Sequence, residues 1–199
     1  MRNAPRTVCL LVLPAVWAAG CATPTDKFMA ERPKIAASVA LLVTREMTDY
    51  PLKSAEELAD DYVLPGLEAA FTDARAIADR GELKAGELLV LPRVAVKRDE
   101  LPSTIQHAAA VSLTVVDARG AEIASASGDG VGRSGTVSPT SYLIFYPIAV
   151  VFKLFTDPMA RSSSQDEALE WAVYDAIRKL HAQREVIESR AATKVVLRR

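Results

Sequence analysis

A predicted β-hairpin decides the fold: residues 108–127 read AAAVSLTVVDARGAEIASAS. Its first half alternates apolar and hydroxyl residues, with Val111, Leu113 and Val115 against Ser112 and Thr114. This period of two predicts a strand with one buried face. Ala118-Arg119-Gly120 then supplies a glycine for a tight turn. Small residues return over 121–127, so the pattern indicates two antiparallel strands joined by a short turn.

Two more strands are predicted upstream of the hairpin. Residues 35–44 form a continuous apolar run rich in β-branched residues, which indicates a strand covered on both faces. Residues 88–97 form another run, and Pro92 within it favours an edge strand or a bulge because proline has no N–H to donate. The Gly- and Ser-rich residues 128–135 favour a flexible loop or a twisted strand end.

Two helices are predicted from capping boxes and apolar periodicity. Ser54 and Glu57 open the first helix, which the pattern carries to residue 78 and Gly81 stops. Pro65 predicts either a kink in this helix or the start of a second one. Ser164 and Glu167 open the last helix, and residues 193–199 are compatible with a short strand or a frayed basic end.

The order of these elements predicts an α+β (mixed α/β) domain. It has one largely antiparallel sheet of about four or five strands with two main helices packed on it. We expect this single domain to span residues 34–190, with an apolar insert at 142–155 and a basic tail at 191–199.

The N-terminus carries a targeting pattern. Arg2 and Arg6 precede an apolar run at 8–19, and small residues lead to Gly20 and Cys21. The pattern resembles a bacterial lipoprotein signal. The resemblance implies removal of residues 1–20 by cleavage between Gly20 and Cys21, covalent lipid such as palmitate on Cys21, and a lipidated tether at 21–33. Residues 22 and 23 are Ala and Thr, and the lack of an Asp after the cysteine points to the periplasmic face of the outer membrane in a Gram-negative source.

Two other interpretations of this N-terminus stay open. An ordinary secretory signal would leave Cys21 as a free thiol. A transmembrane helix is disfavoured, because twelve apolar residues rise only about 18 Å against a hydrocarbon core of roughly 30 Å.

Composition excludes several classes of function. The chain carries 24 Lys and Arg against 25 Asp and Glu, so no basic excess predicts nucleic-acid binding. Its two cysteines are Cys9, which leaves with the signal, and Cys21. We therefore expect no disulfide, no metal site and no cofactor other than the lipid on Cys21.

The layout resembles the N-terminal domain of the Tol-Pal β-propeller protein and, more distantly, the curli secretion-channel lipoprotein. The matching features are the early strand at 38–43, the long helix that follows, the turn Asp117–Gly120 and a late helix with Ala168, Ala172 and Ala176. The resemblance implies assembly, transport or recruitment rather than catalysis. It keeps open a homo-oligomeric export channel, although only one apolar insert is present.

Catalytic patterns are weak. Residues 130–135 match G-x-G-x-x-G, but Pro139 and the preceding meander are poor context for a phosphate-binding helix. His107 and His181 are expected at the surface. An enzyme with an unrecognised site remains an alternative, and His107 with Ser103 or Ser134 would be its best residues.

The apolar segment 142–155 is the sharpest feature after the signal. Its aromatic residues are Tyr142, Phe145, Tyr146, Phe152 and Phe155, and Lys153 is its only charge. It is either a core element that closes the sheet or an exposed contact to membrane or a partner. Together these observations predict a non-catalytic, lipid-anchored envelope protein that binds another envelope component, with an oligomeric state the sequence leaves open.

Overall fold

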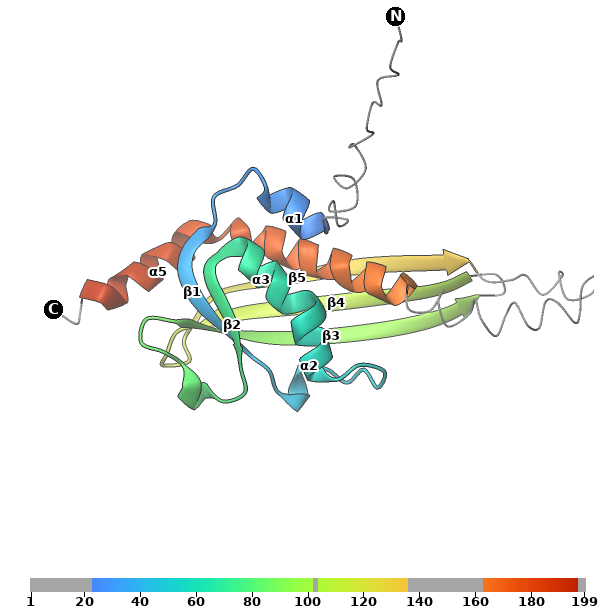
Figure 1. Cartoon of the computed structure of the whole chain (residues 1–199), viewed down its shortest axis with the longest axis horizontal. Helices are drawn as coiled ribbons and strands as arrows, with labels where there is room; N and C mark the ends of the chain where they lie inside the picture. The colour runs from blue at the N-terminus through green and yellow to red at the C-terminus, as the bar shows by residue number, and fades with distance from the viewer. Residues whose placement is uncertain (1–22, 102–103, 136–162, 197–199) are drawn as a thin grey trace, which may run out of the picture.

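A five-stranded mixed sheet forms the centre of the computed structural model, which describes residues 23–101, 104–135 and 163–196 (Figure 1). The strands are β1 Ile35–Leu42, β2 Phe71–Ile77, β3 Leu88–Leu101, β4 Thr104–Val116 and β5 Glu122–Gly135. Their order in the sheet is β2-β1-β3-β4-β5. β1 runs parallel to β2 and β3, whereas β3, β4 and β5 form a long antiparallel meander. The predicted α+β class is confirmed.

The hairpin between β4 and β5 has the predicted turn. Gly120 adopts a φ of 84°, and its N–H donates to the carbonyl of Asp117 at 2.9 Å. The Asp117 side chain also accepts from the N–H groups of Arg119 and Ala121, at 2.7 and 3.0 Å. An aspartate before a positive-φ glycine therefore fixes the register of β4 and β5.

The helices are shorter and more numerous than the sequence pattern predicted. They are α1 Pro24–Met29, α2 Ala55–Leu58, α3 Leu64–Ala70, a helix over 163–181 and α5 Arg184–Val196. Single 3₁₀ turns lie at Arg45–Met47 and Arg80–Glu82. Two segments hold helices that the sequence pattern did not predict: α1 lies within the expected tether at 21–33, and α5 includes residues 193–196, for which a short strand or a frayed end was expected.

The helix opened by Ser54 is confirmed only as far as Ala70. The Ser54 hydroxyl accepts from the Glu57 N–H at 3.1 Å, and the Glu57 carboxylate accepts from the Ser54 N–H at 2.8 Å. A π-helical turn at Ala59–Val63 joins α2 to α3 just before Pro65. Residues 71–77, predicted as helix, are β2 instead. Parallel pairing with β1 overrides their helical periodicity because it buries Phe71 and Ile77 at the two ends of the strand.

Pro92 lies in a part of β3 that does not pair with β1. β1 pairs with β3 only at Leu88, Leu89 and Val90, although β3 is interior in the strand order. The proline therefore interrupts no ladder hydrogen bond with β1, in line with the edge position that its presence favoured.

The main core lies between the sheet and the helices. It includes Val39 and Leu41 of β1, Val111 and Leu113 of β4, and the apolar face of the 163–181 helix. A smaller cluster of Ala40, Ile77, Leu89 and Val116 covers the other face of β1, which confirms that this strand is buried on both sides. Farther along, the same face of β3, β4 and β5 is open, and side chains such as Arg93, Ala110 and Ser127 are exposed there.

The C-terminal helices cover the outer edge of β5. Gln183 donates to the carbonyl of Ser125 at 2.7 Å, and Lys179 donates to that of Ser127 at 2.6 Å. The N–H of Arg133 donates to the Glu167 carboxylate at 3.1 Å. These side chains form hydrogen bonds with backbone groups of β5 that could otherwise pair with another strand.

Candidate functional site

Most sequence-predicted site residues lie outside the described part of the chain. Gly20 and Cys21 fall within residues 1–22, and Ser103 falls in the pair 102–103. The predicted contact residues Tyr142, Phe145, Tyr146, Phe152 and Phe155 fall within 136–162. Their assignments stay predictions, and the site below is built from described residues.

The glycines at 128–135 form the end of β5, so of the two expected alternatives, a flexible loop or a strand end, the strand end is the one present. Gly128, Gly130 and Gly132 share the face that meets the 163–181 helix. A Cβ on Gly130 would lie 2.0 Å from the carbonyl oxygen of Ala168, and one on Gly132 would lie 1.9 Å from that of Ser164. The G-x-G-x-x-G pattern therefore serves close packing of a strand against a helix.

His107 is buried rather than exposed, which corrects the sequence expectation. Its side chain is 1% exposed, and its Nδ1 lies 2.9 Å from the hydroxyl of Ser164, which is fully buried. Ser164 lies within the 163–181 helix beneath Gly132, and Ser134 pairs with Ile105 instead of His107. The fold thus brings His107 to a serine that the sequence had assigned only to a capping box. A buried hydroxyl is inaccessible to a substrate, so this pair links strand and helix.

A polar cluster surrounds the start of the same helix. Lys53 donates to the Tyr62 hydroxyl at 2.6 Å, and that hydroxyl donates to the Asp166 carboxylate in a very short hydrogen bond. Burial, followed by this hydrogen bond, raises the pKa of Tyr62 far above its usual value. Lys53 also lies 3.4 Å from Asp166 and 3.8 Å from Asp61. Lys53, Tyr62 and Asp166 join the segment before α2 and the π-helical turn to the 163–181 helix.

Gln165 and Glu170 extend this cluster. Tyr50 donates to the Gln165 side-chain oxygen at 3.1 Å, while the buried side-chain nitrogen of Gln165 has no hydrogen-bond partner. Burial, and then the nearby carboxylates of Asp166 and Glu167, raise the pKa of Glu170. Sequence periodicity missed this cluster because its members come from separate segments.

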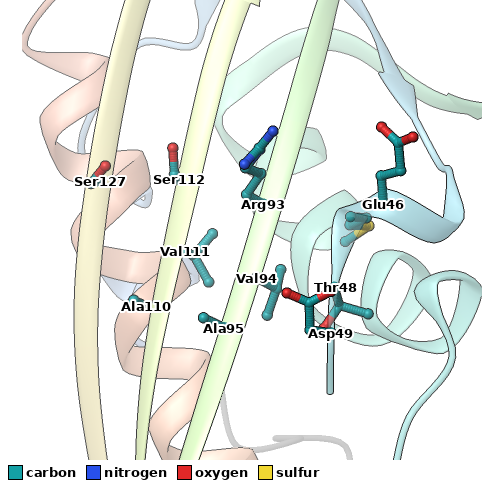
Figure 2. A pocket seen from close by; sticks show the side chains of 11 residues that line it. Glu46, Thr48, Asp49, Arg93, Val94, Ala95, Ala110, Val111, Ser112 and Ser127 are labelled. Atoms are coloured by element: carbon teal, nitrogen blue, oxygen red, sulfur yellow. The ribbon is translucent and has the colours of Figure 1, made fainter. Parts of the chain in front are cut away.

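A groove lies on the open sheet face (Figure 2). We call it the open-face groove. It has a volume of about 260 Å³, and its lining includes Glu46, Thr48, Asp49, Arg93, Ala95, Ala110, Ser112 and Ser127. Figure 2 shows the small side chains of the strands forming its floor, with Glu46 and Asp49 on the neighbouring segment. Thr48 pairs with Val94 in an isolated parallel bridge, which holds this segment beside β3.

A second hollow continues the groove along the same face. Its volume is about 360 Å³, and it shares Glu46, Met47, Arg93 and Ser112 with the first. The floor of the combined surface mixes alanine and serine side chains with apolar residues such as Leu91 and Pro92, and charges of both signs lie at its rim. Such a surface can hold an extended segment or a small molecule.

Among residues 23–101, 104–135 and 163–196, no three His, Cys, Asp or Glu residues are placed to hold a metal ion. Within the same ranges, no helix combines the length and apolar character needed to cross a membrane.

The comparisons with known proteins are sparse. Neither protein-family models nor curated proteins gave a match. Among solved structures, the chain is similar to a minor lipoprotein from Acinetobacter baumannii, with 12% identity and a TM-score of 0.44 over 78% of this chain and 95% of that one. It is also similar to a proposed lipoprotein from Caulobacter crescentus CB15, with 15% identity and a TM-score of 0.33 over 83% and 96% of the two chains. At these scores the similarities carry no functional argument, and the resemblance to the Tol-Pal and curli proteins stays a prediction.

Proposed function

We propose that this protein is a lipid-anchored lipoprotein of the bacterial envelope, held at the periplasmic face of the outer membrane, that binds or scaffolds another envelope component without catalysing a reaction. The observation that carries the proposal is the signal pattern that ends at Gly20 and Cys21. The described fold supports it, because α1 begins at Pro24 and Thr23 caps it. Cleavage before Cys21 would therefore leave the folded domain intact.

The polar residues of the described site support binding more than catalysis. His107 and Ser164 are buried against each other, and Tyr62 is engaged by Lys53 and Asp166. These groups connect elements of the fold. The open-face groove is instead exposed, and its small floor residues leave room for a partner.

The anchor is tested by metabolic labelling. Cells expressing the chain are grown with labelled palmitate, and the protein is isolated from the outer-membrane fraction. We expect label on the natural chain and none on Cys21→Ser. Labelling that persists in Cys21→Ser, or a mature N-terminus at another residue, would contradict the proposal.

The binding role is tested by site-specific photo-crosslinking in intact envelopes. A photoreactive residue replaces Ala110 on the groove floor, and Leu52, which is 65% exposed outside the groove, is the matched control position. We expect a discrete crosslinked product from position 110 that Arg93→Glu abolishes, with no such product from position 52. A product that appears equally at both positions would argue against the groove.

A further inference from the structure

Aromatic side chains gather where α1 meets the 163–181 helix. The rings of Phe28 and Tyr174 meet edge to face, with centroids 5.8 Å apart, and those of Trp171 and Tyr174 do the same at 5.5 Å. Trp171 is 44% exposed, which is high for so large an apolar side chain. We call Phe28, Trp171 and Tyr174 the aromatic surface.

Basic and amphipathic groups border this surface. The Arg32 guanidinium lies 4.0 Å from the centre of the Phe28 ring and donates to the Phe28 carbonyl at 2.6 Å. His181 stacks edge to face on the same ring at 5.9 Å, and its Nε2 lies 3.1 Å from the carbonyl of Pro33. Trp and Tyr rings beside basic residues are typical of the layer where a bilayer meets water, because each ring has an apolar body and a polar edge.

α1 is fixed to the domain rather than free. Thr23 and Asp26 form a reciprocal capping box at its start, and Thr25 and Met29 are buried. Phe28 packs against the main core as well as against Tyr174. The aromatic surface therefore moves with the domain as one body.

The chain length before α1 limits where this surface can lie. Cys21 precedes the capping residue Thr23 by two positions, and two Cα–Cα steps span at most about 8 Å. A lipid on Cys21 would thus hold α1 within one headgroup layer of the bilayer. A long flexible tether would allow the domain to rotate freely, whereas the two-residue step from Cys21 to Thr23 would restrict that rotation.

We propose that the aromatic surface inserts into the headgroup region of the leaflet that carries the Cys21 lipid, and so sets the orientation of the domain. This inference rests on the proposed lipidation of Cys21. The aromatic surface lies on the helical side of the sheet, and the open-face groove lies on the other. Membrane contact would therefore leave the groove accessible to a partner.

Tryptophan fluorescence tests the orientation directly. In a chain of residues 21–199, Trp171 is the only tryptophan and Cys21 the only thiol, since Trp17 and Cys9 precede them. The buried core of the described residues begins at Met29, with Phe28 packed against it, so this chain retains the core. The Cys21 thiol is coupled to a maleimide phospholipid in vesicles of phosphatidylethanolamine and phosphatidylglycerol, with and without a brominated phospholipid.

We expect Trp171 emission to shift to shorter wavelength on coupling and to be quenched by the brominated lipid. The matched control carries Trp171→Phe with Leu52→Trp, which moves the tryptophan to an exposed position before α2. Figure 1 shows α1 and α2 on opposite sides of the molecule in that view. Circular dichroism confirms that both proteins are folded.

The control should show neither a shift nor quenching. Equal quenching of the two reporters, or an unshifted and unquenched Trp171, would overturn the proposed orientation. The coupling supplies the anchor chemically, so a failure here is separate from a failure of palmitate labelling in cells.

Discussion

Replacing Gly130 by Ala tests one of the close contacts between β5 and the 163–181 helix. The added Cβ would lie 2.0 Å from the carbonyl oxygen of Ala168 and 2.5 Å from the nitrogen of Ala172. Both are backbone atoms of the 163–181 helix, so no side-chain rotation relieves the overlap. The helix would have to move by about 1 Å or more to restore ordinary contact distances.

Two opposing effects set the size of the change. Alanine removes the conformational freedom of glycine in the unfolded chain, which stabilises a strand by roughly 0.5–1 kcal/mol. Overpacking a close contact costs typically about 1–3 kcal/mol and occasionally more, and a contact with backbone lies at the upper end. We therefore expect a net loss of about 2 kcal/mol, which for a domain of this size lowers the melting midpoint by about 4–8 °C.

Thermal and urea unfolding, followed by circular dichroism, measure this loss. Val131→Ala is the control, because Val131 is the next residue in β5 and is 47% exposed on the opposite face. Its effect should stay within about 0.5 kcal/mol. Adding Ala172→Gly to Gly130→Ala should not restore stability, since the clash involves backbone. An unchanged or higher midpoint for Gly130→Ala would refute the reasoning.

Three further predictions concern other contacts. Because burial and Asp166 raise the pKa of Tyr62, this hydroxyl stays protonated in the folded state above the usual tyrosine pKa. The free energy of unfolding should therefore fall as pH rises past about 10, and it should fall less in Tyr62→Phe. Ultraviolet titration and urea unfolding would show both effects. The hydrogen bonds from Arg75 lower the pKa of Glu87. The ionised Glu87 carboxylate therefore stabilises the folded state above its unfolded pKa, and this stabilisation is lost as pH falls through the lower folded pKa. Glu87→Gln should reduce the loss of stability at acidic pH. If the segment 142–155 is an exposed contact, Phe152→Ala should weaken flotation with liposomes at an unchanged melting midpoint, whereas a core role would cost about 3–5 kcal/mol.

The sequence predicted the elements whose causes are local. The hairpin turn depends on Asp117 and Gly120, and the start of α2 depends on Ser54 and Glu57, so neighbouring residues were sufficient. β2 was missed because residues 71–77 have helical periodicity, and only pairing with a distant strand makes them extended. Local propensity cannot predict such an override.

The candidate site was predictable in part. His107 lies an even number of residues before Val111, Leu113 and Val115. Extending the alternation of β4 would therefore have placed it on the same buried face. The even spacing of the glycines from 128 to 132 likewise indicates one strand face against a close neighbour. The open-face groove could not be predicted, because an isolated bridge between Thr48 and Val94 is what brings its two distant segments together.

The contact of α5 with β1 has a consequence for export and folding. The carboxylate of Glu188 accepts from the N–H of Ala36 at 2.8 Å, so a strand near the start of the domain is completed by a helix near its end. A chain that crosses a membrane from its N-terminus would have to deliver most of its length before this contact could form. Such long-range closure slows folding. Until α5 arrives, β1 would lack this contact, so the arrival of α5 would be the event that completes the domain.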